Sequence, residues 1–528
     1  MTADPSARTD PAARSAVAPP DSEHRQRPSS PAFRAFIAAG WADRPGGLPG
    51  ALPVTAFTPA RRAAISARFP GERLVVPAGV LRVRSNDTDH RFRPHSAFAH
   101  LTGLGTDREP DAVLVLEPRR GTGPAGGADG GHDAGGADGG HDAVLYFRPR
   151  AERDTEEFYA SSRYGELWIG VRQSLAELAA ETEIETRHLD EVIDAITKDA
   201  GTAEGEVAVR VVREADPDVT AAVDAARGSA GVDAEAAATA DGELLAALSE
   251  LRLVKDAHEI GELRLAVEVT ARGFADIVRA LPRAVQHRRG ERVIERAFEG
   301  RAREEGNGVG YDTIAAAGPH ACTLHWIRND GAVRDGDLVL VDAGAEVDSL
   351  YTADLTRTLP VSGRFSAAQR EVYQAVLEAA DAAFAVARPG SRFRDLHAAA
   401  MRVIAQRLFD WGLLPGTVEE ALDDEGQFHR RWMIHGTSHH LGLDVHDCAQ
   451  ARRDLYLDGE LRPGMVVTIE PGLYFGPADL RAPEAFRGIG VRIEDDVLVT
   501  DDGCQNLSAI LPRTVPGIES WMAGLLGR

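Results

Sequence analysis

The sequence has few cysteines and no long apolar run. Among its 528 residues only Cys322, Cys448 and Cys504 are cysteines, an odd and scattered set without a C-x-x-C pair. This argues against a disulfide framework and indicates a reducing compartment. No apolar stretch approaches the roughly 20 residues that a membrane helix requires. The N-terminal thirty residues also lack the apolar core of a secretory signal. We therefore predict a cytoplasmic protein that does not span a membrane.

Basic residues are scarce relative to acidic ones. The chain has 59 Lys and Arg against 82 Asp and Glu, which gives a formal net charge of -23. A surface this acidic repels phosphate backbones, so we predict no nucleic-acid partner. The same charge disfavours docking on an anionic membrane.

A chain of 528 residues suits two or three domains. Residues 1–30, rich in Pro, Ser, Ala and charge, are expected to form a disordered tail. A duplicated nonapeptide, GGADGGHDA, lies in a flexible Gly-rich loop at 120–143, which we interpret as an expanded hairpin loop. Its His132 and His141 are interpreted as solvated linker residues rather than metal ligands. The expected units are an N-terminal domain at 31–247, a catalytic domain at 248–516 and a C-terminal tail at 517–528.

Helical and strand-like patterns are mixed along both expected domains. Helical spacing of apolar residues predicts helices at 33–41, 367–386 and 394–411, with a helix pair inside 249–281. Short strands are expected at 73–80, 111–116 and 144–147, and strands dominate from residue 311 onward. This mixture favours an α+β or α/β layering.

Five residues of the second half stand where a short apolar run meets a turn. They are Asp342, Asp354, His439, Glu470 and Glu494. Four ionised acids in one site would repel one another, and some would take up protons. Two divalent cations balance four carboxylates, and a neutral imidazole completes such a set. The pattern therefore predicts a two-metal hydrolytic centre.

Some of these acids also have a simpler interpretation. A strand-ending Asp near a turn glycine, such as Asp342 with Gly344, is often a turn former, and Glu470 could belong to a salt bridge or stand at a sheet edge. Glu346 and Asp348 are expected to be loop acids, although either could compete as a ligand. Asp495 and Asp496 are expected to form a turn.

Four histidines cluster in the segment MIHGTSHHLGLDVHD. They are His435, His439, His440 and His446. His435 and His439 stand four residues apart, as on a zinc-binding helix, but Gly436 replaces the catalytic Glu of H-E-x-x-H. The segment is therefore predicted to be a loop that presents imidazoles. Alternation along RGIGVRIEDD places Arg492 and Glu494 on one strand face, where Arg492 can support a carboxylate.

Taken in order, these motifs closely resemble the metal-dependent aminopeptidase P (Xaa-Pro aminopeptidase) family. The resemblance spans about residues 51–513 and is sharpest over 311–507. It implies an α+β protein with an N-terminal α/β domain and a C-terminal pita-bread domain, in which helices flank two antiparallel sheets. It also implies a homo-oligomer and peptide substrates with proline in the second position.

The resemblance further implies roles for individual residues. The five residues of the predicted centre would bind two metal ions, with a water or hydroxide between them. Asp354 and Glu494 would bridge the ions, and Glu470 would also carry the proton. The ions are expected to be Mn²⁺, with Zn²⁺ or Co²⁺ as alternatives.

The remaining predicted site residues would handle the substrate. His325, in HWIRND, and His446, in VHD, would hold the peptide and stabilise the tetrahedral oxyanion. His435 and Tyr474 would line the pocket for the second residue, and Arg492 would support the metal ligands.

Two other functions fit the same resemblance. A prolidase would cleave only Xaa-Pro dipeptides, and a non-catalytic pita-bread protein would bind peptides without cleaving them. The chain departs from the family in two places. The spacing from Asp342 to Asp354 is one residue longer than usual, and Ala99 stands where an aromatic residue often reaches a neighbouring subunit.

Overall fold

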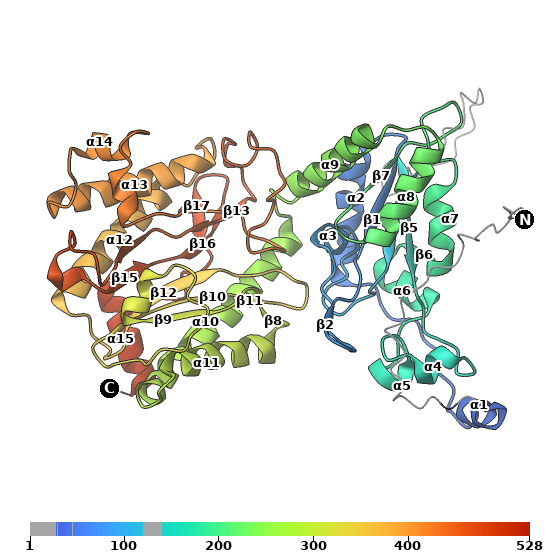
Figure 1. Cartoon of the computed structure of the whole chain (residues 1–528), viewed down its shortest axis with the longest axis horizontal. Coiled ribbons are helices and arrows are strands. Elements are labelled where there is room, and N and C mark those ends of the chain that lie inside the picture. Colours follow the sequence, from blue (N-terminus) through green and yellow to red (C-terminus); the bar gives the residue numbers. More distant parts are fainter. Residues whose placement is uncertain (1–27, 29, 45, 120–139, 528) are drawn as a thin grey trace, which may run out of the picture.

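The chain folds into two bodies joined by consecutive helices (Figure 1). The computed structural model describes residues 28, 30–44, 46–119 and 140–527. The expected tail at 1–30 and the expected loop at 120–143 therefore lie largely outside the described residues. The described end of that loop differs from expectation, because β5 (His141–Phe147) begins at His141. His141 is buried and lies 2.5 Å from Ser66 Oγ and 2.6 Å from the Glu72 carbonyl oxygen.

A five-stranded mixed sheet forms the centre of the N-terminal body. Its strand order is β6-β5-β4-β1-β7, from β1 (Arg73–Pro77), β4 (Val113–Pro118), β5, β6 (Glu185–His188) and β7 (Val209–Val211). β4 and β5 pair antiparallel, as expected for a hairpin whose loop carries the repeat. A small separate hairpin consists of β2 (Val83–Ser85) and β3 (Thr88–Asp89).

Helices cover both faces of this sheet, because its strands are apolar on both sides. Along β1, Leu74 and Val76 pack into one core cluster, whereas Val75 packs into another on the opposite face. The first face is covered by α2 (Thr58–Ser66), α3 (Ser96–Thr102), α6 (Leu175–Thr182) and α9 (Ala234–Leu251). The second face is covered by α7 (Val192–Thr197) and α8 (Pro217–Ser229). Smaller helices are α1 (Pro31–Ala38), η1 (Pro53–Ala56), α4 (Glu156–Ala160), α5 (Glu166–Ile169) and η2 (Leu189–Glu191).

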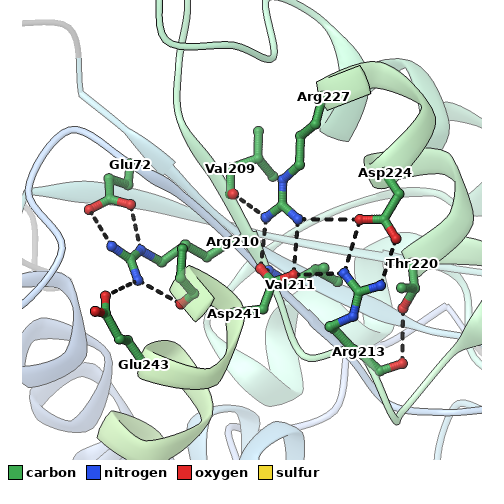
Figure 2. A network of polar contacts seen from close by, with 11 residues as sticks. Glu72, Val209, Arg210, Val211, Arg213, Thr220, Asp224, Arg227, Asp241 and Glu243 are labelled. Carbon is green, nitrogen blue, oxygen red and sulfur yellow. Dashed lines mark hydrogen bonds and ion pairs between the residues drawn. The ribbon is translucent and has the colours of Figure 1, made fainter. Parts of the chain in front are cut away.

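A network of arginines and acids ties α8 and α9 to the edge strand β7 (Figure 2). Buried Asp241 of α9 accepts two hydrogen bonds from Arg227 of α8, at 2.7 and 2.9 Å. It also accepts a hydrogen bond from the Val211 backbone N–H at 2.8 Å. The paired charges let this edge be covered without leaving a polar group unsatisfied.

The C-terminal body holds antiparallel sheets between two helical layers (Figure 1). One sheet has the order β12-β10-β9, from β9 (Ile314–Ala317), β10 (Leu338–Ala343) and β12 (Leu355–Pro360). The other has the order β13-β16-β17, from β13 (Val466–Ile469), β16 (Asp495–Val499) and β17 (Cys504–Asn506). Two-stranded pairs are β8 (Gly308–Val309) with β11 (Ala345–Glu346), and β14 (Gly472–Phe475) with β15 (Ile489–Arg492).

Long helices lie on the two sides of these sheets, as expected for an α+β pita-bread domain. They are α10 (Ala257–Val285) and α11 (Gly290–Glu305) on one side, and α12 (Ala367–Val386) and α13 (Phe393–Asp410) on the other (Figure 1). The shorter helices are α14 (Val418–Leu422), α15 (Val515–Leu526), η3 (Gly318–Cys322), η4 (Phe428–Arg431) and η5 (Glu484–Phe486).

Two expected boundaries differ from the structure. The predicted division at 247/248 falls inside α9, whose Leu248 packs in the N-terminal core, whereas Leu253 packs in the C-terminal core. The predicted C-terminal tail at 517–528 is wrong through Leu526, because α15 packs on the catalytic body. Its residues Ile518 and Met522 are fully buried, and a helix with such an apolar face is stabilised by that burial.

Candidate metal centre and active site

The ends of strands and two loops bring the five predicted ligands to one place. Asp342 was expected to end its strand, but β10 continues for one more residue, to Ala343. Within β10, Asp342 pairs with Thr356 of β12. Asp354 directly precedes β12, and Glu470 directly follows β13. Glu494 stands between β15 and β16, and His439 lies in the loop before β13.

All five side chains line one cavity of about 480 Å³. Ligand atoms of Asp354, His439 and Glu494 lie within 4.8 Å of one another. His439 Nε2 is 3.2 Å from Asp354 Oδ2 and 3.6 Å from Glu470 Oε1. The predicted convergence of four acids and one imidazole is therefore present in the structure.

This crowding changes the proton affinity of the carboxylates. Burial raises the pKa of Glu470 to about 7, and the neighbouring Asp354 adds to the rise. Burial, with repulsion from Asp354 and Glu470, raises the pKa of Glu494 well above its ordinary value. Oxygen-rich donors with excess negative charge suit divalent cations, so these residues fit a metal site.

The geometry of His439 suits metal binding through Nε2. Its Nδ1 lies 3.1 Å from the His440 carbonyl oxygen, so we assign the Nδ1 proton to that hydrogen bond. Nε2 is then the atom that faces Asp354 and Glu470. Burial opposes protonation here, but the Asp354 contact and the Glu470 charge raise the pKa of His439 to about 9.

Several residues hold the acids in place, and Arg492 is the one that the sequence predicted. Its guanidinium donates to Asp342 Oδ2 at 2.5 Å, to Tyr474 Oη at 3.0 Å and to Thr356 Oγ1 at 3.2 Å. These three contacts fix the position of the buried Arg492 guanidinium and of the Asp342 carboxylate beside it.

Two other residues that support the acids were not predicted from the sequence. Tyr311 donates toward Asp342 Oδ1 at 2.6 Å and also contacts Asp354. Thr356 Oγ1 donates to Glu494 Oε2 at 2.6 Å. Neither residue type has a spacing signal that distinguishes it from an ordinary core or strand residue.

The expected turn at Asp495 and Asp496 is wrong. Both residues are fully buried in β16. Asp495 accepts a hydrogen bond from Arg357 at 2.7 Å, and Asp496 accepts one from the Asp354 backbone N–H at 3.2 Å. Strand pairing with β13 extends through both acids. Arg357 of β12 balances the charge of Asp495, whereas burial and the nearby Asp354 raise the pKa of Asp496 well above its ordinary value and favour its neutral form.

His435 lines the cavity beside Glu470 and is held by Tyr474. Tyr474 Oη accepts from Arg492 and lies 2.7 Å from His435 Nε2, to which it donates. Burial and the nearby Arg492 lower the pKa of His435 to about 3, so its ring is neutral. Tyr474 itself lines a neighbouring cavity of about 360 Å³ rather than the cavity of the acids.

The other candidate histidines separate into two groups. His325 and His446 line the mouth of the cavity and are exposed, and the His446 ring lies 4.4 Å from that of His439. His440 is buried and stacks on Phe393 with ring centroids 5.0 Å apart, so it belongs to the core.

The alternative acidic ligands lie outside the cavity. Glu346 forms an ion pair with Arg93 at 2.8 Å and accepts from Asn307 at 2.6 Å. The Asp348 carbonyl oxygen accepts from the Thr106 backbone N–H at 3.2 Å. The longer loop between Asp342 and Asp354 therefore contacts the N-terminal body instead of entering the site.

Comparison with known proteins identifies the family. A model of metallopeptidase family M24 matches residues 261–501, and a model of the aminopeptidase P N-terminal domain matches residues 59–208. Xaa-Pro aminopeptidase 1 of Streptomyces coelicolor is 50% identical over 491 residues, which cover 93% of this chain and 91% of that protein. The chain belongs to the aminopeptidase P family. Xaa-Pro aminopeptidase of Escherichia coli is 34% identical over 475 residues, covering 88% and 97% of the two chains.

Solved structures of aminopeptidase P share the whole architecture. The Pseudomonas aeruginosa aminopeptidase PepP superposes with a TM-score of 0.73 at 31% identity, covering 90% of this chain and all of that one. A zinc-substituted E. coli aminopeptidase P in complex with product gives a TM-score of 0.71 at 30% identity, covering 90% and 99% of the two chains.

These matches confirm the predicted fold and enzyme class. The chain is a metal-dependent aminopeptidase, and the relatives favour neither the prolidase nor the non-catalytic alternative. Within the described part of the chain, no helix combines the length and the apolar character needed to cross a membrane.

Proposed function

We propose that this aminopeptidase removes the N-terminal residue from peptides whose second residue is proline, with two divalent ions held by Asp342, Asp354, His439, Glu470 and Glu494. The convergence of these five residues in one cavity carries the proposal. The Xaa-Pro aminopeptidase name of the curated relatives supports the substrate class.

Bound divalent ions lower the pKa of water and so provide a hydroxide nucleophile near neutral pH. Asp354 and Glu494 would be the shared ligands, as the family resemblance implies, and their ligand atoms lie within 4.8 Å of each other and of the His439 imidazole nitrogen. The carboxylate-rich donor set favours Mn²⁺, and the imidazole also admits Zn²⁺ or Co²⁺.

Glu470 is the residue proposed to carry the proton. A carboxylate can transfer a proton during hydrolysis, and Glu470 faces the other acids and the imidazoles of the cavity. Its Oε2 lies 3.6 Å from His435 Nδ1, and its Oε1 faces His439 and Thr468.

His325 and His446 are proposed to hold the peptide at the cavity mouth. Both are exposed donors beside the acids, where a hydrogen bond to the carbonyl oxygen stabilises the developing oxyanion.

The cavity also has an apolar wall suited to a proline ring. Leu324, Ile327 and Val445 line it together with His435. Proline has no backbone N–H and a fixed φ, so an enzyme that requires that N–H rejects Xaa-Pro bonds. A pocket that contacts the ring through apolar atoms does not need the missing donor.

A peptide series tests this function. We expect cleavage of Xaa-Pro-Yaa-Zaa, loss of activity with a chelator and recovery on addition of Mn²⁺. The matched peptide Xaa-Ala-Yaa-Zaa should react much more slowly. Activity confined to the Xaa-Pro dipeptide, or full activity in the chelator, would contradict the proposal. The cytoplasmic location and the homo-oligomer stay predictions.

A further inference from the structure

The loop that carries His325 depends on side chains for its position. Residues 323–337, all of which are described, form turns and extended chain between η3 and β10. Leu324, His325 and Ile327 of this loop line the cavity of the acids. A loop without a backbone ladder must be fixed by other hydrogen bonds or it will move.

One buried carboxylate makes two bonds to this loop and two to the β9 and η3 segment that precedes it. Glu291, in the first turn of α11, has no exposed surface. Its Oε1 accepts from the Ala317 backbone N–H at 2.9 Å and contacts His320 Nδ1 at 2.7 Å. Its Oε2 accepts from Trp326 Nε1 at 2.9 Å and from the Gly331 backbone N–H at 2.6 Å.

These partners lie on both sides of His325 in the chain. Trp326 is its direct neighbour, and the Trp326 ring stacks on His320 with centroids 3.9 Å apart. At Gly331, a Cβ atom would lie 2.7 Å from Glu291 Oε2, so only glycine allows the backbone to approach this closely. Glu291 therefore connects β9 and η3, which precede His325, to Trp326 and Gly331, which follow it.

A second contact from α11 supports the same loop. Buried Asn329 accepts from the Ala315 backbone N–H at 3.0 Å. It donates to the Thr313 carbonyl oxygen and to Glu295 Oε1, both at 2.8 Å. Asn329 also has a positive φ of 49°, which Asn tolerates better than most residues.

We propose that Glu291 is a positioning residue that holds His325 at the mouth of the active site. Its negative charge is required, because all four partners are donors that converge on two oxygens. The proposal rests on the proposed function, since it acts through the substrate contact of His325. Glu291 does not itself line the cavity.

A double-mutant cycle tests the coupling between the two residues. Glu291→Gln keeps the shape but places an amide N–H₂ against two donors. We expect kcat/KM for an Xaa-Pro peptide to fall by about 10- to 100-fold, because small displacements of a substrate contact have large effects. In a His325→Ala background, the same change should cost less than about twofold. Equal losses in both backgrounds, or no loss in the single variant, would overturn the proposal.

Two further variants separate positioning from a general loss of stability. Trp326→Phe keeps the ring stack but removes the Nε1–H, so it should give a smaller loss that is also non-additive with His325→Ala. Glu259→Gln removes a buried first-turn carboxylate from α10, outside the cavity. It should lower the melting temperature while its effect on kcat/KM stays additive with that of His325→Ala.

Hydrogen exchange provides a readout that does not require turnover. Peptides covering 323–333 should exchange faster in Glu291→Gln, whereas peptides covering 345–360 should not change. Unchanged exchange in 323–333 would overturn the proposal even if activity falls. A wild-type enzyme that cleaves no Xaa-Pro peptide would instead contradict the proposed function, and the exchange result would still decide the role of Glu291.

Discussion

At the scale of single residues, the site is a set of acids whose protons must be replaced by cations. Glu470 and Glu494 have raised pKa values because burial and neighbouring carboxylates disfavour their ionised forms. Arg492 supplies a positive charge to this group through Asp342. Metal binding should therefore release protons, and its affinity should rise with pH near neutrality.

Glu470→Gln removes the titratable group while keeping the shape of the side chain. We expect kcat at saturating Mn²⁺ to fall by about 10²- to 10⁴-fold, the usual contribution of a proton-transfer group. Steady-state kinetics, with metal content measured on the same samples, checks this. Glu346→Gln is the matched control, because Glu346 is a buried acid outside the cavity. Near-normal rates in Glu470→Gln would remove Glu470 from its proposed role.

Arg492→Lys keeps a charge but cannot reach Asp342, Thr356 and Tyr474 together. Since groups that orient metal ligands commonly affect affinity by 10–100-fold, we expect the Kd for Mn²⁺ to rise by about that factor. Titration of the metal-free enzyme with Mn²⁺ measures it. Arg487→Lys is the control, because Arg487 Nε donates to two backbone carbonyls outside the cavity. An unchanged Kd would show that Arg492 does not support the metal ligands.

At the scale of elements, the sequence patterns located α12, α13 and the strands next to the predicted ligands. The helix pair expected inside 249–281 is instead the end of α9 and the single helix α10, and α11 was not predicted. Helix α12 has the predicted bounds 367–386, because a capping box at Ser366 and Gln369 starts it and its apolar spacing is regular. The strands of Asp342 and Glu470 were recognisable from apolar runs that end at turn residues. Tyr311, Thr356 and Glu291 were not predictable, because their roles depend on contacts between distant segments.

The C-terminal helix α15 was also not predicted from the sequence. A tail was expected at 517–528, whereas the apolar residues of α15 pack on the body. Ile518→Ala should lower the free energy of unfolding by about 2–5 kcal/mol, because it leaves a cavity in a closed core. Denaturant unfolding measures this. Ser520→Ala, at an exposed position of the same helix, should change it by less than about 0.5 kcal/mol. Equal effects of the two variants would contradict the packing of α15.

At the scale of the whole molecule, a buried ion cluster joins the linker between the two bodies to the loop that carries His446. Asp447 lies 3.0 Å from Arg252 Nε and 3.2 Å from Lys255 Nζ, and all three are buried. Burial favours the neutral acid, but Arg252 and Lys255 outweigh it and lower the pKa of Asp447 well below 3.8. The cluster therefore fixes the linker and the active-site loop together.

The lowered pKa of Asp447 makes the stability of the native state depend on pH. A carboxyl whose folded pKa lies below its unfolded value stabilises the native state above that unfolded value. Asp447 should thus contribute fully above about pH 3.8 and progressively less as the pH falls below it. Asp447→Asn should cost about 3–5 kcal/mol at pH 7, because it leaves two buried cations without their partner. The difference between variant and wild type should shrink in acid, as urea unfolding at a series of pH values would show. A difference independent of pH would contradict this account.

The central claim is that five side chains of the catalytic domain together bind a pair of divalent cations. Anomalous diffraction from crystals soaked in Mn²⁺ tests it most directly. The account predicts two manganese peaks between Asp342, Asp354, His439, Glu470 and Glu494. The absence of a peak there, or peaks only at surface acids, would contradict it.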